Sequence, residues 1–399
     1  MTRPGVLALP AMLADLEELV TCESFSADHA AVARSAGVVG ALGTRLLGAA
    51  PETIVIGGAT HLRWVLGTPR VLLLGHHDTV WPVGSLRRLP WSSDGGIARG
   101  PGVLDMKAGL VQLFHALASL PSPDGVCVLV NGDEEVGSPT SQQLIEDAAR
   151  RCAAAFVMEA SADASGALKT ARKGTSRYEV VVRGRAAHAG QDPHLGVNAA
   201  VEAAHQVLAV AAFGASPGTA GDGGPALGST TVTPTLLTAG TTRNTVPALA
   251  RVSVDVRAPT AAAQDRVDAL MRGLTARTPG ARLEVLGGRQ RPPMEAESSA
   301  GLFALACRLA AELGQGPLRG VAVGGASDGN LTAAVGCPTL DGLGGVGAGA
   351  HADGEYVDVA RMVPRARLLA RLVARLIDDT TDWDVPPRRG RPPGNRGPV

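Results

Sequence analysis

The sequence is poor in the features that mark nucleic-acid-binding and membrane-binding proteins. Aromatic residues make up only 3% of the 399 residues, too few for the stacking platforms that hold unpaired bases. Basic and acidic residues both number 37, so no net charge draws the chain to nucleic acid or to anionic lipid. We therefore expect neither a nucleic acid nor a membrane as a partner.

Paired cysteines and long apolar runs are also missing. The five cysteines are scattered, and no two of them form a C-x-x-C pair. This pattern disfavours a disulfide framework and a cysteine zinc site, and it fits a reducing compartment. No run approaches the ~18 apolar residues that span a bilayer, and the N-terminal apolar patch is broken by Pro10 and lacks a signal-peptide pattern. We expect a cytoplasmic protein.

The sequence of 399 residues is long enough for two domains. Short apolar runs at 71–74, 126–130 and 153–158 alternate with helical patterns, which predicts a parallel sheet covered on both faces. Ser138 before Pro139 predicts a helix that starts there. The α/β character returns near residue 298, with helices expected at 300–313 and 362–378.

The pattern between these parts differs. Strand and helix signals from 178 to 286 follow the order β-α-β-β-α-β, which indicates a small ferredoxin-like insert, with a Gly/Pro-rich loop at 214–228. We therefore expect a catalytic α/β domain at 1–175 and 295–383 and an inserted domain at 176–294. The tail at 384–399 holds five prolines and four arginines, and we expect it to be disordered.

Five polar segments follow strands or loops, where open α/β sheets place their sites. In Gly75–Val80, His76 and Asp78 lie on the same side of an extended chain, which suits a metal ligand and its orienting partner. In Gly100–Lys107, glycine and proline shape a turn that could present Asp105 inward. Each segment alone has an ordinary interpretation: a polar loop after a strand for the first, and a helix cap at Asp105 for the second.

The other three segments are acidic or contain histidine. Asp133, Glu134 and Glu135 directly follow a buried strand, where acids are costly unless they are exposed or bind cations. Glu159 ends the next strand, and His351 lies in a glycine-rich run. Together the two histidines and three carboxylates, with Asp105 shared, would give each of two zinc ions three protein ligands and leave room for a hydrolytic water.

With these segments the sequence resembles the zinc aminoacylase and carboxypeptidase family, which includes glutamate carboxypeptidase, acetylornithine deacetylase, succinyl-diaminopimelate desuccinylase and aminoacylase. The match runs from about residue 10 to 380, and the five motifs occur in the family's order and at family-like spacing. The runs 184–190 and 355–358 are most similar to the glutamate carboxypeptidase branch. The resemblance implies a zinc-binding α/β domain with an inserted lid domain that also forms a homodimer.

The resemblance also implies roles for single residues. One zinc would be held by His76, Glu159 and Asp105, and the other by Glu135, His351 and Asp105; cobalt or manganese could substitute. Asp78 would orient His76, and Glu134 would be the general base. From the lid, His188 would reach across the dimer to the oxyanion, Asn244 and Arg257 would hold the substrate carboxylate, and the loop with Gly325 and Ser327 would lie near the substrate.

The implied activity is hydrolysis of an amide bond next to a free carboxylate, in a C-terminal glutamate-type peptide or an N-acyl amino acid, by a water between the metals. Three alternatives remain. The chain could act on a specialised-metabolism substrate, by hydrolysis or acyl transfer. It could be a non-catalytic relative, although all seven positions of the metal centre are kept. It could be a serine hydrolase, because residues 325–329 fit G-x-S-x-G and Asp341 and His351 follow Ser327 in triad order.

Overall fold

The structure is a computed structural model that describes residues 7–214 and 228–378. The predicted tail lies outside the described residues, as does nearly all of the predicted loop at 214–228. The chain divides into two compact units. The first comprises Met1–Thr170, Ala296–Val321 and Ser327–Val399, and the second comprises Ala171–Glu295 and Ala322–Ala326. Within the described ranges, no helix combines the length and the apolar composition needed to span a membrane.

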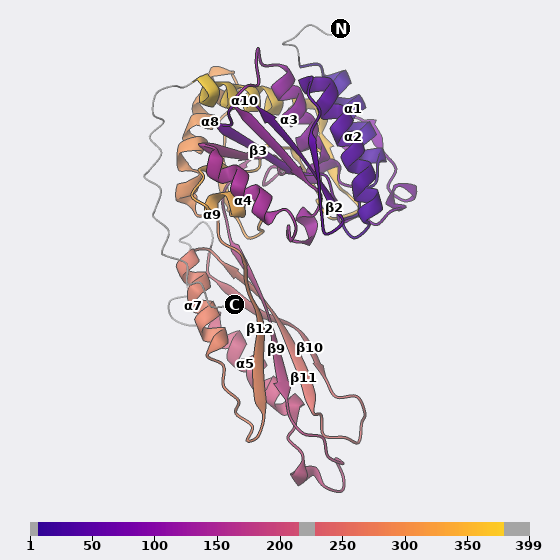
Figure 1. The fold of residues 1–399 in the computed structure, drawn as a ribbon, viewed down its shortest axis with the longest axis vertical. Coiled ribbons are helices and arrows are strands. Elements are labelled where there is room, and N and C mark those ends of the chain that lie inside the picture. Colours follow the sequence, from indigo (N-terminus) through magenta and orange to yellow (C-terminus); the bar gives the residue numbers. More distant parts are fainter. Residues whose placement is uncertain (1–6, 215–227, 379–399) are drawn as a thin grey trace. The chain divides into compact units, whose positions relative to one another are not determined.

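The first unit is built on a six-stranded sheet in the order β1-β2-β6-β3-β7-β14 (Figure 1). Its strands are β1 (Glu52–Ile56), β2 (Ala59–Leu66), β3 (Val71–His76), β6 (Val126–Asn131), β7 (Ala154–Val157) and β14 (Thr339–Leu340). The helices are α1 (Leu9–Thr21), α2 (His29–Leu47), α3 (Ala108–Ala118), α4 (Gln142–Arg151), α8 (Ala300–Glu312), α9 (Gly329–Ala334) and α10 (Val359–Asp378). A small sheet adds β15 (Gly347–Ala348), β16 (Tyr356–Asp358), β5 (Ile97–Arg99) and β4 (Ser92–Asp94).

The prediction of a parallel sheet holds for part of the main sheet only. Strands β6, β3, β7 and β14 are parallel, whereas β1 and β2 form an antiparallel hairpin whose second strand pairs with β6. The hairpin turns at Gly57 and Gly58, which both have positive φ. Two consecutive glycines between strands are a strong hairpin signal, and the sequence interpretation overlooked it.

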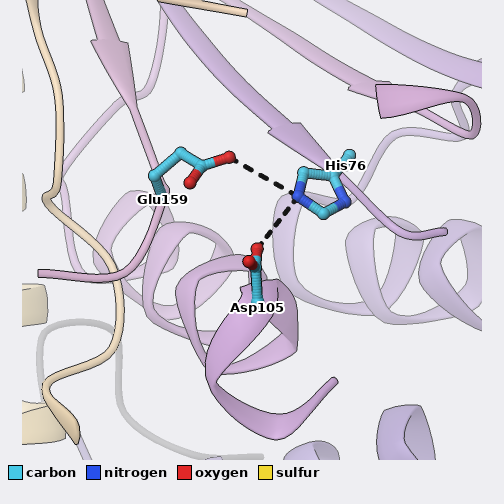
Figure 2. A group of neighbouring side chains, drawn as sticks. All are labelled: His76, Asp105 and Glu159. Atoms are coloured by element: carbon cyan, nitrogen blue, oxygen red, sulfur yellow. Dashed lines mark hydrogen bonds and ion pairs between the residues drawn. The ribbon is translucent and has the colours of Figure 1, made fainter. Parts of the chain in front are cut away.

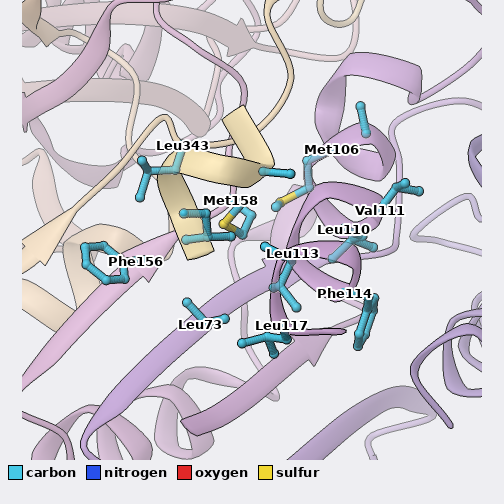
Figure 3. Packing of buried hydrophobic residues seen from close by; sticks show 14 of the residues in the cluster. Leu73, Met106, Leu110, Val111, Leu113, Phe114, Leu117, Phe156, Met158 and Leu343 are labelled. Carbon is cyan, nitrogen blue, oxygen red and sulfur yellow. The ribbon is translucent and has the colours of Figure 1, made fainter. Parts of the chain in front are cut away.

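Both faces of the sheet are buried, as the unbroken apolar runs predict. Odd-numbered residues of β3 such as Leu73 pack with α1, α2, α3, α8 and α10, and even-numbered residues such as Leu72 pack with α4 and α9. Figure 3 shows the first of these layers, where Leu73 and Phe156 of the sheet lie near Leu113 and Leu117 of α3. The side chains that carry the predicted chemistry lie at or directly after the carboxyl ends of these strands.

The second unit is a ferredoxin-like domain. Its elements are β9 (Gly174–Arg183), α5 (Ala199–Phe213), β10 (Thr231–Ala239), β11 (Leu249–Ala258), α7 (Ala261–Arg272) and β12 (Arg282–Arg291). They follow the predicted β-α-β-β-α-β order, and the antiparallel sheet has the strand order β10-β11-β9-β12. The chain passes between the two units within β8 (Leu168–Arg172) and near β13 (Gly320–Val323).

One predicted helix start is wrong. Helix α4 begins at Gln142 rather than at Pro139, and Ser138 has a left-handed backbone with φ +57. The Ser138 hydroxyl does not cap a helix but donates a hydrogen bond to the Asp328 carboxylate. A cap pattern identifies a side chain that can satisfy a backbone N–H, and here a distant carboxylate competes for the same hydroxyl.

The packing of α2 gives a test of the fold. A Cβ added at Gly43 would lie 2.4 Å from Cζ2 of Trp64, and one at Gly37 would have no described atom within 4 Å. Gly43→Ala should therefore overpack the core and destabilise the protein by about 1–3 kcal/mol. Gly37→Ala, on the exposed face of the same helix, should stabilise it by up to about 1 kcal/mol. Urea unfolding of both variants measures this, and an equal effect of the two changes would contradict the packing.

Candidate metal centre

Three neighbouring strands end at one edge of the main sheet. Strands β6, β3 and β7 are adjacent and parallel, so their carboxyl ends meet there, which is where open α/β sheets bind ligands. His76 is the last residue of β3, the acids Asp133, Glu134 and Glu135 follow β6, and Glu159 follows β7. The parallel pairing thus gathers three of the five segments that the sequence singled out.

The first cluster joins His76, Asp105 and Glu159 (Figure 2). Nε2 of His76 lies 3.2 Å from Oδ1 of Asp105 and 3.5 Å from Oε1 of Glu159. The His76 side chain is 2% exposed, and the two acids are 16% and 10% exposed. The other oxygen of Glu159 lies 3.5 Å from Nζ of Lys169, so this carboxylate faces the cluster with one oxygen.

The second cluster joins Asp105, Glu135 and His351. Nε2 of His351 lies 3.3 Å from Oδ2 of Asp105 and 3.2 Å from Oε2 of Glu135. His351 has φ +62, a conformation that is uncommon for a residue with a side chain and that gathers at functional sites. The two oxygens of Asp105 therefore face two different histidines, and Asp105 belongs to both clusters.

Asp105 does not cap a helix, so the ordinary interpretation of its motif is wrong. It lies in a turn, Val103–Lys107, with non-helical backbone angles at Asp105 itself, and the N-cap residue of α3 is Lys107. The turn follows Gly102, which has φ +71 and no room for a Cβ because Cγ2 of Thr79 would lie 2.5 Å away. Glycine at this position lets the chain turn sharply just before Asp105.

Asp78 supports two of the segments at once. Nδ1 of His76 lies 3.0 Å from the Asp78 carbonyl oxygen and 3.5 Å from its carboxylate, which leaves Nε2 facing the acids. The buried Asp78 carboxylate accepts hydrogen bonds from the backbone N–H groups of Glu134 and Glu135 at 3.1 and 3.2 Å and from Ser26 at 2.7 Å. Asp78 thus holds His76 mainly through its main chain and fixes the acidic turn through its side chain.

The charges in the two clusters depend strongly on one another. Burial disfavours protonation of His76, but the carboxylates of Asp105, Asp78 and Glu159 outweigh it and raise the pKa of His76 well above its ordinary value. The carboxylates of Asp105 and Glu135 raise the pKa of His351 to about 10. Burial raises the pKa of Glu135. The site therefore has a negative potential that holds cationic charge at both histidines.

The donor set fits divalent metal ions. Imidazole nitrogen and carboxylate oxygen are ordinary zinc ligands, and three protein ligands with an open position are typical of catalytic zinc. Oε1 of Glu135 is buried and has no hydrogen-bond partner among the described residues, which is costly for a carboxylate oxygen unless a cation binds it. Each of the two clusters offers three ligand atoms within 4.8 Å of one another.

The geometry contradicts the serine-hydrolase alternative. The Ser327 hydroxyl is buried and lies 2.7 Å from the Asp341 carboxylate, whereas a catalytic triad needs a histidine between serine and aspartate. His351 instead faces Asp105 and Glu135. Ser327 is 1% exposed and its Oγ also accepts a hydrogen bond from Gly329, so the hydroxyl anchors its own loop and is not presented to a substrate.

The remaining predicted residues lie in the second unit. His188 pairs with Thr245 through a β-bridge, and the N–H of Ala189 donates to the carbonyl of Asn244 at 2.8 Å, so His188 and Asn244 are neighbours. Nδ1 of His188 accepts from the backbone N–H groups of Gly190 and Gln191. A neutral imidazole that accepts at Nδ1 carries its proton on Nε2.

Arg257 lies at the other end of the same sheet. It pairs with Thr175 at the start of β9, whereas Leu249, at the start of β11, pairs with Arg183 at the end of β9. Leu249 and Arg257 are therefore about 25 Å apart along β11, and Asn244 precedes Leu249 in the connection between β10 and β11. The guanidinium of Arg257 is held by Asp255 through Nε and Nη2 at 2.8 and 3.1 Å. The backbone carbonyl of Gly325, another predicted residue, accepts a hydrogen bond from Nη1 of Arg172 at 2.9 Å.

The model of peptidase family M20/M25/M40 matches residues 72–375 of the chain. The chain belongs to this family. Membership implies a metallopeptidase that uses divalent metal ions, and it confirms the resemblance and the fold class expected from the sequence. Residues 72–375 include both clusters and the whole of the second unit.

Known members of the family are similar over nearly the whole chain. Carboxypeptidase G2 of Pseudomonas sp. (strain RS-16) is 32% identical over 389 residues, which cover 92% of this chain and 89% of that protein. The structure of an M20 family metallo-carboxypeptidase from Sulfolobus solfataricus matches with a TM-score of 0.71 and 16% identity, over 92% of this chain and 99% of that one. A dinuclear metal-binding M20 peptidase from Bacillus subtilis matches with a TM-score of 0.65 and 15% identity, over 93% and 98% of the two chains.

The raised histidine pKa values predict how metal binding depends on pH. At pH 7 the metal-free protein holds His76 and His351 protonated, and a metal needs neutral imidazoles. Zinc affinity should therefore rise with pH throughout the range below the His351 pKa of about 10. The stability that protonation of His351 gives the metal-free protein is complete below about pH 6.5, the ordinary imidazole pKa, and is lost as the pH rises to about 10.

Titration calorimetry of zinc in buffers with different ionisation enthalpies measures these protons. We expect close to one proton released for each histidine at pH 7, and His351→Ala should abolish one of them. Binding heats that do not depend on the buffer would contradict the electrostatic account.

Proposed function

We propose that the protein is a di-zinc hydrolase that cleaves an amide bond next to a free carboxylate, in a C-terminal glutamate-type peptide or an N-acyl amino acid. The observation that carries this proposal is the position of Asp105, with one oxygen toward His76 and the other toward His351. A carboxylate between two three-ligand sets is the arrangement that a two-metal hydrolytic site requires. The similarity to Carboxypeptidase G2 supports the choice of substrate class.

The ligand sets would be His76, Glu159 and Asp105 for one ion and Glu135, His351 and Asp105 for the other. Bound there, the ions would polarise the amide carbonyl and make water nucleophilic at neutral pH. Three carboxylates and a hydroxide together balance the charge of two divalent ions, so the buried site would carry no net charge.

Glu134 is the proposed general base. It shares a short 3-10 turn, Glu134–Val136, with the proposed ligand Glu135. Neighbouring side chains of such a turn point about 120° apart, so only one of the two can enter the second cluster, and Glu135 does. Glu134 is then left to accept the proton of the attacking water and to pass it to the leaving amine.

Arg257 is the proposed grip on the substrate carboxylate. A guanidinium has five N–H donors in a fixed plane, and Asp255 uses two of its nitrogens. The edge that remains can bind a carboxylate through two parallel hydrogen bonds. Asp255 would thus hold the fork in a fixed orientation before the substrate arrives, which reduces the entropy lost on binding.

His188 is the proposed donor to the oxyanion, and a second chain would supply it. The proton on Nε2 suits this role because backbone donors occupy Nδ1. Arg183 and Thr175, the β9 partners of Leu249 and Arg257, lie about 25 Å apart along the sheet, and His188 follows Arg183. We infer that His188 and Arg257 of one chain are farther apart than a dipeptide extends. If Arg257 of one chain binds the substrate, His188 and Asn244 at the same site must come from a partner.

The proposed homodimer has a candidate surface at one edge of the second unit. Among the residues that the structure describes, β10 is an edge strand of its sheet, and Leu236 and Leu237 on it are 68% and 53% exposed. Leu208, on α5, is 69% exposed, and α5 packs on β10. An edge strand with exposed leucines is suited to pairing with a second copy of the chain.

The two adjacent glutamates should separate catalysis from metal binding. Glu134→Ala should keep two zinc ions and lower kcat by about two to four orders of magnitude, the usual contribution of a general base. Glu135→Ala should instead lose zinc, because it removes a ligand of the second ion. Elemental analysis combined with hydrolysis of N-acyl amino acids and C-terminal glutamate dipeptides tests both, and a Glu134→Ala enzyme within about tenfold of the parent would refute the assigned base.

Mixed dimers should reveal the shared site. His188→Ala and Glu134→Ala chains should each be nearly inactive, but a mixed dimer holds one site with an intact base and an intact partner histidine. Random mixing should therefore restore about a quarter of the activity. The control is a mixture of His188→Ala chains with His188→Ala, Glu134→Ala double variants, which should stay inactive. A monomer by sedimentation, or verified mixed dimers without activity, would reject the shared site.

A further inference from the structure

Glu355 is a buried acid that is not a member of either cluster. Its carboxylate is hydrogen-bonded to the loop that carries Asp105. Its carboxylate accepts hydrogen bonds from four N–H groups. Oε1 accepts from the backbones of Leu104 and Asp105 at 2.8 and 3.1 Å. Oε2 accepts from the backbone of Gly102 at 3.0 Å and from the indole of Trp81 at 2.9 Å. Three of these donors belong to the loop that ends in Asp105.

The pairing of the small sheet explains why this acid reaches that loop. Strands β16 and β5 are antiparallel, with Tyr356 opposite Arg99, so the residue before Tyr356 lies beside the loop that starts at Gly100. Strand β16 also pairs with β15, and His351 lies in the connection between them. A single hairpin thus carries His351 near its tip and Glu355 at its base, against the Asp105 loop.

The Glu355 carboxylate accepts two hydrogen bonds at each oxygen, so all of its favourable acceptor positions are occupied. Loss of the carboxylate would leave three backbone N–H groups of the loop without acceptors in a buried environment. The loop would then be free to relax, and the Asp105 carboxylate would no longer be held at the midpoint between His76 and His351.

We propose that Glu355 is a positioning residue of the metal centre, which ties the Asp105 loop to the His351 hairpin and so fixes the shared carboxylate for both ions at once. This inference rests on the proposed function in that two ions share Asp105. It assigns Glu355 no contact with substrate. Its distinguishing consequence is that the loss of Glu355 weakens both metal sites together, because Asp105 belongs to both.

Glu202 offers a matched control for a purely structural role. It is fully buried in the second unit and accepts hydrogen bonds from the backbone N–H groups of Arg277 and Thr278 and from the side chain of Gln206. Like Glu355 it anchors a loop through backbone donors, but no proposed metal ligand belongs to that loop. Glu202→Gln should therefore lower stability without changing the affinity for metal.

The experiment compares Glu355→Gln with Glu202→Gln in full-length protein. The glutamine keeps the size of the side chain, but its NH₂ group opposes two of the four donors. Competition with a chromophoric chelator should show zinc affinity reduced by about 10–100-fold at both ions, the usual effect of removing a residue that orients a ligand. Cobalt(II)-loaded protein should show an altered visible spectrum, and kcat should fall more than KM rises. Glu202→Gln should match the parent in all three measurements.

Zinc affinity and cobalt spectrum unchanged in Glu355→Gln, with stability lowered as in Glu202→Gln, would overturn the inference and leave Glu355 an ordinary loop anchor. Loss of one ion only would also overturn it. If Glu355→Gln does not fold, Trp81→Phe removes one donor and keeps most of the ring; it should weaken zinc binding several-fold, and unchanged binding would again overturn the inference. A parent protein that binds no zinc would refute the proposed function itself, independently of the behaviour of the variants.

Discussion

The concentration of negative charge around Asp105 is the constraint on which the rest of the site depends. Asp105, Glu135 and Glu159 are three carboxylates of low exposure gathered around two imidazoles. Such a group is unstable without compensating positive charge. In the metal-free protein the histidines supply that charge by holding protons, which is why their pKa values rise. Metal ions that displaced these protons would bind into a potential that the fold has already created.

The fold creates that potential through two separate sheets. The parallel strands β6, β3 and β7 bring three segments to one edge, and the small sheet aligns the hairpin of His351 with the Asp105 loop. Two buried acids connect these loops through hydrogen bonds. Asp78 accepts from backbone N–H groups of the acidic turn, and Glu355 accepts from backbone N–H groups of the loop that carries Asp105. The clusters are therefore held by backbone N–H groups of several loops, and little side-chain freedom remains to be lost when a metal binds.

The sequence predicted the parts of this arrangement that depend on local patterns. Apolar runs and the turn residues between them predict the buried strands, the ferredoxin-like insert and the five polar segments. The order and chemistry of those segments predict the proposed metal ligands, which lie together in two clusters. The failures are at positions where distant residues compete. Ser138 was expected to cap a helix, but its hydroxyl binds Asp328. The position of Glu355 does not follow from any local pattern, because nothing in the nearby sequence shows that an acid before a short strand will face a loop 250 residues away. The separation of Arg257 from His188 needs the strand register, which the sequence does not specify.

The central claim is that one carboxylate joins two metal ions. Anomalous diffraction from crystals of the zinc-loaded protein, measured on both sides of the zinc absorption edge, tests it most directly. The account predicts two peaks per chain, one bound by His76 and Glu159 and the other by Glu135 and His351, with the oxygens of Asp105 divided between them. A single peak, or two peaks of which one lacks Asp105 as a ligand, would contradict it.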